Sequence, residues 1–576
     1  MFYNFKLLRK FFSLLNIPNW KLLIFLIFFI FVSLIDIINL SLIAPFIVTL
    51  IDPAKLDSFI IVSYLEQFNI ENKLLFFGYS IIIIFFIKTI LTILVRWLIK
   101  RFALSIEKKL QLDLITSYLN IDYESFIKKK SSEIYRNIKD LSLNSAAAID
   151  MTLRVLSETI ILLAILIFLS TVSFKSLLFL MLITLLVFLI YQVFLKPLNI
   201  ELGSQRVEAI KNQYKYIEAG IKGYKEIKTI NKENFIIRNL DKFNNFLFKI
   251  NLKSSLITDT PRYVLELFVL SAAIIILLNA KIGLNNFSDI IPSIGIFLFA
   301  GARILPGSSA IIVGMNVIHN NIRAIDTVYN ELKNLKYNNK EIKLTNNLKD
   351  PFIKISLDKC SFAFKNNKKK ILDKIDFFIN SKDCVGITGE SGSGKTTLVE
   401  LVLGLLKPLE GEIKYNNIST KDLSKNLLGK AAYITQEPVI LDDSIMTNVA
   451  LSKNDKDINK EKLMQSLKNA NLLKFINTLP KGIYTEIGGE TGIRLSGGQN
   501  RRMALARAFY HGDEIIILDE ATSSLDVENE NKILEQIKSL RGKMTFIIIS
   551  HQKNTLKYCN KVYEVINNKV ILKNVQ

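Results

Sequence analysis

Long apolar runs, interrupted by two long polar stretches, fill the N-terminal part of the chain. A helix that crosses a membrane needs about 20 mostly apolar residues. The pattern meets this requirement six times and predicts membrane spans at about residues 22–50, 74–98, 155–172, 176–195, 261–280 and 290–322. From about residue 350 onward the pattern changes to short strands and turns, which is typical of a soluble α/β domain.

The two polar stretches separate the second span from the third and the fourth span from the fifth. Both have the pattern of charged helices with amphipathic patches, for example at residues 100–121 and 214–247. Because a helix rises about 1.5 Å per residue, two arms of about 25 residues reach roughly 40 Å beyond the bilayer and return. We expect the turns at their tips near residues 122–128 and 218–230. The alternative is a pair of loosely ordered loops.

The charge distribution predicts the orientation in the membrane. The 576 residues carry a formal net charge of +22, with Lys and Arg concentrated in the polar stretches that flank the apolar runs. This is the pattern that the positive-inside rule produces. Together with the even number of spans, it places both termini and both polar stretches on the cytoplasmic side of a bacterial inner membrane.

Composition also argues against several classes of protein. Basic residues are not interleaved with stacking aromatics, so nucleic acid is not an expected partner. The three cysteines, Cys360, Cys384 and Cys559, show neither CxxC nor Cys/His spacing, which argues against structural zinc and disulfides. The first apolar run is too long for a signal-peptide core and no small-residue cleavage site follows it, so it is expected to stay as a membrane helix.

The most specific chemical motif is the glycine-rich segment at residues 389–397, which lies between an apolar strand and a helix. Its glycines let backbone N–H groups surround a β-phosphate, and the N-terminus of the helix adds its positive end. Lys395 is expected to reach the β- and γ-phosphates, and the Thr396 hydroxyl to ligate Mg²⁺. The predicted ATP site comprises Gly389, Glu390, Ser391, Gly392, Ser393, Gly394, Lys395, Thr396 and Thr397.

Two adjacent acids, Asp519 and Glu520, follow the apolar strand at residues 515–518. Such a strand can deliver Asp519 to the coordination shell of Mg²⁺, and Glu520 is then placed to polarise an attacking water. Two acids after a buried strand are by themselves consistent with an ordinary strand end. Paired with the glycine-rich loop, they indicate ATP hydrolysis.

The segment Leu495-Ser-Gly-Gly-Gln499, followed by a basic helix, resembles the signature sequence of ATP-binding cassette (ABC) proteins. The resemblance covers the whole soluble part and implies further roles at matching positions. Phe364 resembles the aromatic residue that stacks on adenine, and Gln436 the glutamine that senses Mg²⁺ and the membrane arms. Asp526 lies in a segment that resembles the loop crossing a dimer interface. His551 resembles the histidine that contacts the γ-phosphate, although a surface histidine is the alternative.

The family implies an α-helical membrane domain at residues 1–335, with six spans and long cytoplasmic extensions, followed by an α/β P-loop ABC ATPase domain at 350–576. It also implies a homodimer, in which the signature of one copy completes the ATP site of the other through Ser496, Gly497, Gly498 and Gln499. The implied catalytic residues are Lys395, Gln436, Glu520 and His551, and the Mg²⁺ ligands are Thr396, Gln436 and Asp519. The family further implies that the tips at 122–128 and 218–230 are the coupling helices of an exporter.

Charged residues inside apolar helices are rare, because each costs roughly 2.5–3.5 kcal/mol at mid-bilayer on insertion scales. Lys88, Arg262 and Arg303 lie in the second, fifth and sixth predicted spans. If they line a cavity, they form a site for an anion such as a phosphate or pyrophosphate. The alternative is that they reach an interface or pair with acids, the candidates being Asp36, Glu158 and Glu266.

The segments at residues 41–46, 261–266 and 303–306 resemble the flippases of bacterial protein N-glycosylation (PglK type), which move lipid-linked oligosaccharide. The resemblance implies an anionic lipid or lipid-linked glycan as substrate, with the basic residues Lys88, Arg262 and Arg303 in the cavity. It also implies a short external helix against membrane lipid near residues 56–68, where an ordinary loop helix is the alternative. Two other functions stay open, a peptide or toxin exporter and an ATP-gated channel or regulator.

Overall fold

The computed structural model describes residues 18–51, 72–172, 189, 191–282, 287–339, 351–364, 369–419, 430–512, 514–520 and 527–573. The chain divides into two compact units. The helical unit comprises Met1–Asn120 and Lys129–Tyr337, and the second unit comprises Ile121–Lys128 and Asn338–Gln576. The segment predicted as the first coupling helix therefore belongs to the same unit as the ATPase motifs.

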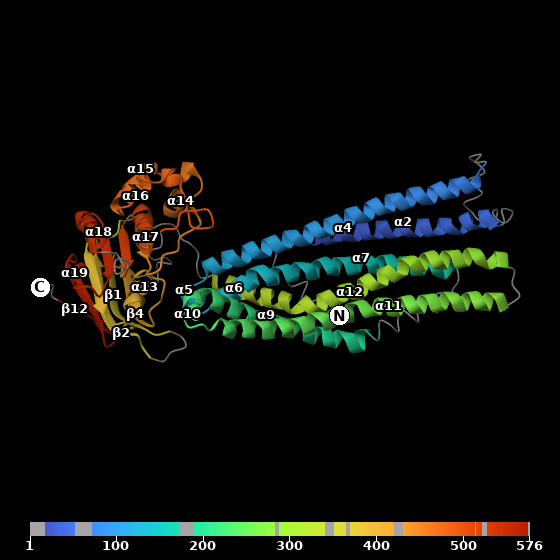
Figure 1. The fold of residues 1–576 in the computed structure, drawn as a ribbon, viewed down its shortest axis with the longest axis horizontal. Coiled ribbons are helices and arrows are strands. Elements are labelled where there is room, and N and C mark those ends of the chain that lie inside the picture. The colour runs from blue at the N-terminus through green and yellow to red at the C-terminus, as the bar shows by residue number, and fades with distance from the viewer. Residues whose placement is uncertain are drawn as a thin grey trace. The chain divides into compact units, whose positions relative to one another are not determined.

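The helical unit consists of long helices that run alongside one another (Figure 1). The long helices are α2 (Asn19–Ile51), α4 (Lys73–Asn120), α7 (Ser142–Val172), α9 (Lys196–Lys222), α11 (Glu233–Ile282) and α12 (Phe287–Asn339). Shorter helical segments are α6 (Ser131–Arg136), η2 (Asn137–Leu141), η3 (Tyr191–Leu195) and α10 (Tyr224–Thr229). A buried apolar cluster joins α2, α4, α7 and α12, with Phe29, Ile99, Ile165 and Ile304 among its members.

Four helices in the described part of the chain are long and apolar enough to cross a membrane. They contain the segments Trp20–Leu50, Lys73–Asn120, Ser131–Thr171 and Ala300–Leu335. The first, second, third and sixth predicted spans fall on these four helices, and the fifth falls on α11. Most of the fourth predicted span and the predicted external helix at 56–68 lie outside the described residues.

Helix α4 shows why these sequences suit a bilayer. Its side chains Val95 and Ile99 are buried in the apolar cluster, whereas Ile82, Phe86 and Ile93 are exposed. A helix that is apolar on both its packed and its exposed side is stable where hydrocarbon, rather than water, surrounds it. The same helix continues without a break into the charged segment at residues 100–121, which the sequence predicted as part of a cytoplasmic extension.

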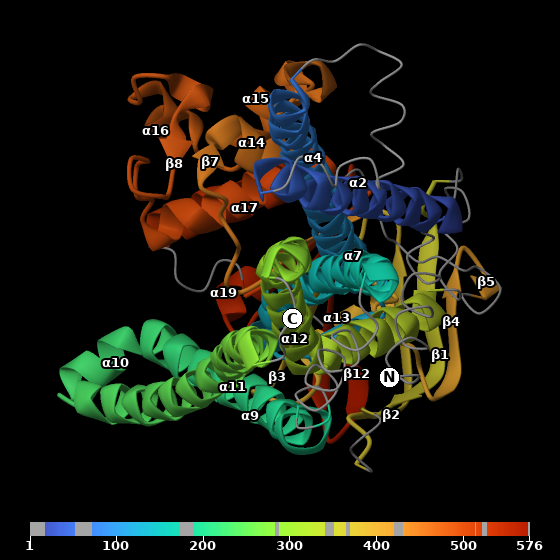
Figure 2. The same cartoon turned by 90° about the vertical axis from the view of Figure 1, so that its right-hand side faces the viewer.

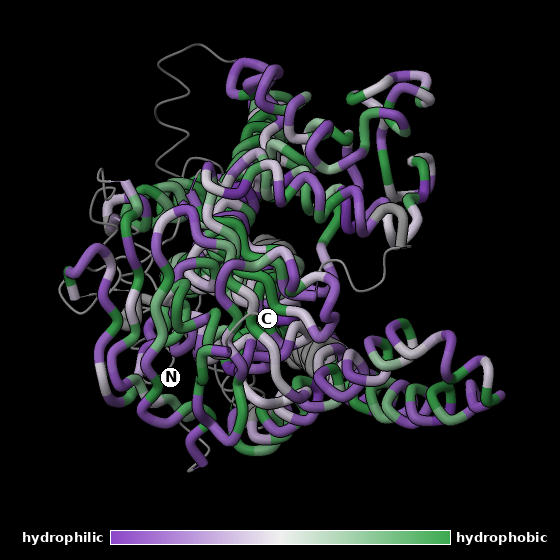
Figure 3. Tube along the Cα trace, turned by 90° about the vertical axis from the view of Figure 1, so that its left-hand side faces the viewer, coloured by the Kyte–Doolittle hydropathy of each residue, from purple (hydrophilic) through white to green (hydrophobic). Residues whose placement is uncertain are grey.

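The helices α9, α10 and α11 form a hairpin that is set apart from α2, α4 and α7 within the helical unit (Figure 2). Hydrophobic and hydrophilic residues alternate along this hairpin (Figure 3). The apolar side chains at its tip, Ile221, Tyr224 and Ile230, are exposed. The tip coincides with the second predicted coupling helix at 218–230.

The second unit contains a mainly parallel six-stranded sheet in the order β12-β11-β3-β10-β9-β6. An antiparallel sheet in the order β2-β1-β4-β5 and a small pair, β7 and β8, complete the strands. The bounds are β1 (Lys354–Phe362), β2 (Leu372–Asn380), β3 (Cys384–Gly389), β4 (Glu410–Tyr415), β5 (Ile418–Ser419), β6 (Ala431–Ile434), β7 (Asp443–Ser444), β8 (Glu486–Ile487), β9 (Ile515–Asp519), β10 (Thr545–Ile549), β11 (Lys561–Ile566) and β12 (Lys569–Lys573).

The parallel strands are buried on both faces. Every residue of β10 and the four isoleucine and leucine residues of β9 are buried, which is the pattern expected when helices cover both sides of a parallel sheet. The covering and flanking elements are α13 (Lys395–Val402), α14 (Ile445–Ala450), η4 (Asp455–Asp457), α15 (Lys460–Asn469), α16 (Leu473–Asn477), η5 (Gly482–Tyr484), α17 (Gly497–His511), α18 (Val527–Leu540) and α19 (Lys553–Leu556). Helix α5 (Tyr123–Ile127) also belongs to this unit.

Candidate functional site

The glycine-rich loop connects β3 to α13 through three residues that require glycine. Gly389, Gly392 and Gly394 have φ angles of 145°, 80° and 105°, a region that side chains strongly disfavour. A Cβ at Gly389 would also clash with the carbonyl oxygen of Val565. The loop therefore keeps its backbone close to β11 and leads directly into the N-terminus of α13, where backbone N–H groups can donate hydrogen bonds to a phosphate.

Two side chains of this loop fit a phosphate ligand. The Lys395 ammonium folds over the loop and donates to the carbonyl oxygens of Gly389 at 2.9 Å and Glu390 at 2.8 Å. Burial lowers the pKa of Lys395, and the nearby charges of Glu520 and Asp519 oppose that shift. In the described part of the chain, the buried hydroxyl of Ser393 has no hydrogen-bond partner. A phosphate of ATP would accept the hydrogen bond that the Ser393 hydroxyl does not make here, and it would also pair with the Lys395 ammonium.

The predicted Mg²⁺ ligands Thr396 and Asp519 come together at the end of β9. The Thr396 hydroxyl donates to Oδ2 of Asp519 at 3.3 Å. The described residues contain no group of three or more His, Cys, Asp or Glu side chains that could hold a metal. One hydroxyl and one carboxylate still fit Mg²⁺, because this ion takes few protein ligands and fills its shell with water and substrate phosphates.

Three of the predicted catalytic residues, Gln436, Glu520 and His551, also converge, although they come from distant parts of the sequence. Gln436 donates from Nε2 to Oε2 of Glu520 at 3.2 Å. Nε2 of His551 lies 3.3 Å from Oε1 of Glu520. Glu520 itself adopts a left-handed backbone conformation with φ of 51°, an unfavourable state for a side chain of this size. In this conformation its carboxylate contacts both partners, and these contacts help to offset the backbone strain.

The other predicted nucleotide contacts are placed differently. Ser496 caps α17, since its side chain accepts from the Gln499 N–H while the Gln499 side chain accepts from the Ser496 N–H. The first two residues of α17 are Gly497 and Gly498, so no side chain covers the backbone at the N-terminus of this helix. Phe364 packs edge-on against Phe362 at 5.1 Å between ring centroids. Asp526 lies outside the described residues.

Two protein-family models match this chain. Residues 22–298 match the ABC transporter transmembrane region, and residues 372–523 match the ABC transporter family. The chain is an ABC transporter. A solved structure described as a bacterial Atm1-family ABC exporter with ATP bound has the same fold, with a TM-score of 0.72 over 96% of this chain and 95% of that one, at 16% identity.

Curated relatives match a shorter stretch. An ATP-dependent lipid A-core flippase from Shewanella sp. (strain MR-4) is 34% identical over 219 residues, which is 38% of this chain and 36% of the relative. The protein of the same name from Coxiella burnetii is 38% identical over 198 residues, which is 34% of this chain and 33% of the relative. The matched stretch thus spans about a third of each relative's length.

The helical unit of this ABC transporter contains a charged cluster in its apolar interior. Asp36 on α2 is buried and forms ion pairs with Lys88 of α4 and with Arg303 of α12, whose Nε lies 3.4 Å from Oδ2 of Asp36. Two of the predicted substrate residues therefore have an acidic partner inside the protein, which is the alternative arrangement considered above. The side chain of the third, Arg262 on α11, lies outside the described residues.

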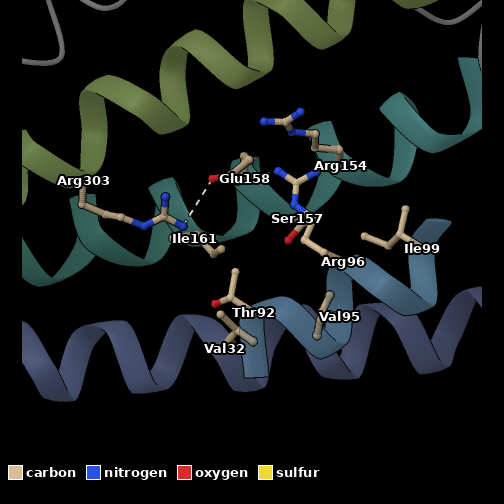
Figure 4. A pocket seen from close by; sticks show the side chains of 10 residues that line it. All are labelled: Val32, Thr92, Val95, Arg96, Ile99, Arg154, Ser157, Glu158, Ile161 and Arg303. Atoms are coloured by element: carbon tan, nitrogen blue, oxygen red, sulfur yellow. Dashed lines mark ion pairs between the residues drawn. The ribbon is translucent and has the colours of Figure 1, made fainter. Parts of the chain in front are cut away.

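The cluster extends into a pocket between α2, α4, α7 and α12 (Figure 4). Arg303 Nη2 lies 3.3 Å from Oε2 of Glu158, and Arg96 Nη2 lies 3.9 Å from Oε1 of the same carboxylate. Arg154 lines the pocket as well, and its buried Nε has no hydrogen-bond partner in the described part of the chain. Three guanidinium groups therefore line this pocket, and two of them pair with the Glu158 carboxylate.

Sequence reasoning did not select Arg96 or Arg154. Arg96 was visible as a charge near the end of the second predicted span, and Arg154 directly precedes the predicted start of the third. A residue at a span end usually reaches the interface, so neither position suggested a site. Because α4 and α7 both extend well beyond the predicted spans, the two side chains lie well inside their helices.

Proposed function

We propose that this exporter uses ATP to move an anionic lipid, such as a lipid-linked oligosaccharide, across the bacterial inner membrane. The observation that supports this most is a pocket lined by Arg96, Arg154 and Arg303, two of which, Arg96 and Arg303, pair with the pocket-lining acid Glu158. Relatives that match the chain over about a third of their length are named lipid A-core flippases, which favours a phosphate-bearing lipid as the class of substrate.

The balance of charge favours an anion over a neutral or cationic cargo. Four cationic side chains of the described cluster, Lys88, Arg96, Arg154 and Arg303, lie among two carboxylates, Asp36 and Glu158. Uncompensated charge in an apolar interior is costly, so the cluster gains stability from an added anion. The planar guanidinium group binds phosphate oxygens in pairs, which suits a phosphate or pyrophosphate head.

The acids of the cluster act as internal counter-ions in this proposal. Asp36 and Glu158 hold the arginine and lysine side chains while no lipid is bound. An incoming phosphate replaces part of this pairing, so binding exchanges one set of ion pairs for another and avoids leaving a bare charge. Such an exchange lets the site release its lipid again, because the cations regain their internal partners.

ATP hydrolysis is assigned to the residues that converge in the second unit. Lys395, Ser393 and the backbone of the glycine-rich loop would hold the phosphates, and Thr396 with Asp519 would hold Mg²⁺, which would neutralise charge on the phosphate oxygens. Glu520 holds the attacking water and accepts its proton. Gln436 and His551 position the Glu520 carboxylate through their contacts at 3.2 and 3.3 Å.

A second copy of the chain is the proposed partner. The N-terminus of α17 begins with two glycines and is capped by Ser496, so it can contact phosphate but carries no loop to hold a nucleotide by itself. The exposed apolar tip of the α9–α11 hairpin also needs a partner surface. A homodimer supplies both, with the ATPase domains and both termini in the cytoplasm.

ATPase activity of the purified chain in liposomes tests the substrate class. A polyprenyl-pyrophosphate glycan and a phosphorylated lipid A are expected to stimulate hydrolysis, whereas the same glycan on a neutral carrier is not. Stimulation by a peptide in place of any lipid would contradict the proposal and favour a peptide exporter. An ATP-dependent ion current without lipid movement would favour a channel or regulator.

A further inference from the structure

The carboxylate of Asp519 receives two hydrogen bonds from different elements. Besides Thr396, the hydroxyl of Tyr433 on β6 donates to Oδ2 of Asp519 at 2.7 Å. Strands β6 and β9 are parallel neighbours, with Tyr433 opposite Ile517, so the sheet itself fixes the tyrosine beside the acid. Burial and the hydrogen bond to Asp519 raise the pKa of Tyr433, so its hydroxyl remains a donor at neutral pH.

A second carboxylate lies near this pair. Glu400 follows Thr396 by one helical turn on α13, so both side chains are on the same face of the helix. It is 9% exposed and accepts a hydrogen bond from the hydroxyl of Tyr123 at 3.0 Å. Burial raises the pKa of Glu400, the Tyr123 hydroxyl lowers it, and the charge of Asp519 raises it further. Because Thr396 on this face bonds to Asp519, Glu400 lies on the side of α13 that carries the Asp519 contact.

Tyr123 is the first residue of α5, the helix that directly follows α4 in the chain. Asp122 caps α5 by accepting from the Ser125 N–H at 2.9 Å. The Tyr123 ring packs against the apolar core between the sheets of the ATPase unit. Burial and the neighbouring charge of Glu400 raise the pKa of Tyr123 to about 12, so it too remains a donor.

We propose that Tyr433 is a positioning residue for Asp519 and that the Tyr123–Glu400 hydrogen bond makes Mg²⁺ affinity depend on the docking of α5. This inference rests on the proposed ATP-driven function and deepens it. Tyr433 fixes the orientation of the carboxylate that holds the metal. Glu400 adds a second negative charge that attracts the dication, and Tyr123 holds that charge beside Asp519. Without the Tyr123 hydroxyl, the Glu400 carboxylate has lost the donor that holds it there.

Metal affinity can be measured without turnover. Mn²⁺ serves as a paramagnetic substitute for Mg²⁺, and its free concentration is read by electron paramagnetic resonance on the full chain in detergent with a non-hydrolysable ATP analogue. We expect Tyr433→Phe to weaken Mn²⁺ binding about tenfold, the effect of losing one hydrogen bond to a charged group. Binding of the analogue without metal is expected to stay unchanged, which also shows that the variant is folded.

A matched control is Tyr563→Phe, which removes the hydroxyl of another buried tyrosine of the same unit, bonded to the Phe378 carbonyl at 3.1 Å. It is expected to leave Mn²⁺ affinity unchanged. Excess Mn²⁺ is expected to restore ATPase activity to Tyr433→Phe, because a positioning defect is overcome by metal concentration. Wild-type affinity in Tyr433→Phe would overturn the role of this residue.

The role of α5 is tested by a double-mutant cycle. Tyr123→Phe and Glu400→Gln are each expected to weaken Mn²⁺ binding about threefold, the effect of one charge acting through partly aqueous surroundings. The double variant is expected to be no weaker than Glu400→Gln alone, because the tyrosine acts only through the acid. Additive losses, or no loss in either single variant, would overturn the link. A wild-type chain that binds Mn²⁺ with nucleotide but does not hydrolyse ATP would instead contradict the proposed function.

Discussion

Arg303 of α12 lies 3.3 Å from Glu158 of α7, although the two residues are far apart in the sequence and both lie in apolar helices. The contact joins two parts of one charged network, because Arg303 also pairs with Asp36 of α2. A network of this kind holds four helices together through charge. In a membrane, apolar packing alone discriminates poorly between a neighbouring helix and the lipid. It also supplies the cations that the proposed lipid site requires.

Neutralising the cations separates transport from hydrolysis. Lys88→Gln combined with Arg303→Gln is expected to abolish lipid-stimulated ATPase activity and lipid movement while basal hydrolysis stays within about twofold of wild type. Both activities are measured in proteoliposomes. The matched control is Arg101→Gln on α4, whose guanidinium stacks on Trp97 outside the pocket. Lipid movement that survives in the double variant would show that these cations do not bind the cargo.

Removing the internal counter-ion exposes the cations to the lipid. Asp36→Asn is expected to destabilise the helical unit by about 3–5 kcal/mol, the effect of leaving buried charges unpaired. A phosphate-bearing lipid is then expected to raise the melting temperature more in Asp36→Asn than in wild type, as measured by thermal unfolding in detergent. The comparison variant is Asp150→Asn, because Asp150 pairs at 3.7 Å with the largely exposed Lys100. An equal shift in both variants would argue against counter-ion exchange.

Glu520 carries the hydrolytic step in this account. Glu520→Gln keeps the size of the side chain and its contact with Gln436 but removes the base, so hydrolysis is expected to fall by about 100-fold or more. ATP binding is expected to persist, and trapped nucleotide on the washed protein measures it. Glu535→Gln, an exposed position on α18, serves as the reference. Near-normal turnover in Glu520→Gln would assign the base to another residue.

The contacts of Asp383 lead us to expect that the stability of the ATPase unit depends on pH. Burial alone would raise its pKa, but the Lys561 ammonium at 2.7 Å and the Asn380 N–H at 2.9 Å outweigh burial and hold the pKa of Asp383 below its ordinary value. A lowered pKa in the folded state means that this stabilisation is present above the unfolded pKa of about 3.9 and is lost as the pH falls through the folded value.

Asp383→Asn is therefore expected to lower the free energy of unfolding by about 1–3 kcal/mol at pH 7 and to reduce its dependence on pH between about 5 and 3. Thermal unfolding followed across this range measures both effects. Asp455→Asn is the comparison, since Asp455 pairs with Lys460 on an exposed surface. A variant with the full pH dependence of wild type would show that another acid is responsible.

The sequence predicted which residues lie together at the candidate nucleotide site, because these residues lie in short motifs. Lys395 and Thr396 are adjacent, Asp519 and Glu520 are adjacent, and a strand preceding each pair fixes its position at one edge of the sheet. No short sequence motif indicated the contacts between elements that are distant in the sequence. The Tyr433–Asp519 and Tyr123–Glu400 hydrogen bonds depend on which strands and helices become neighbours, and a pattern of apolar positions does not specify that.

In the helical unit, the sequence predicted apolar segments but not how they are combined. Hydropathy located the first, second, third and sixth spans on helices that the structure describes. It did not specify that α4 runs from Lys73 to Asn120 as one helix, which joins the second span to its charged extension. The pairing of Lys88 and Arg303 with Asp36 was one of two alternatives, and only the packing of α2, α4 and α12 distinguished them. Arg154 had no motif to mark it.

The most direct test of the account is the transbilayer movement of a fluorescent phosphate-bearing lipid in proteoliposomes, compared with its dephosphorylated analogue, with and without ATP. The account predicts that only the phosphate-bearing lipid moves faster than in empty liposomes, and only when ATP is hydrolysed. Equal movement of both lipids, or movement of the anionic lipid that needs no ATP, would contradict it.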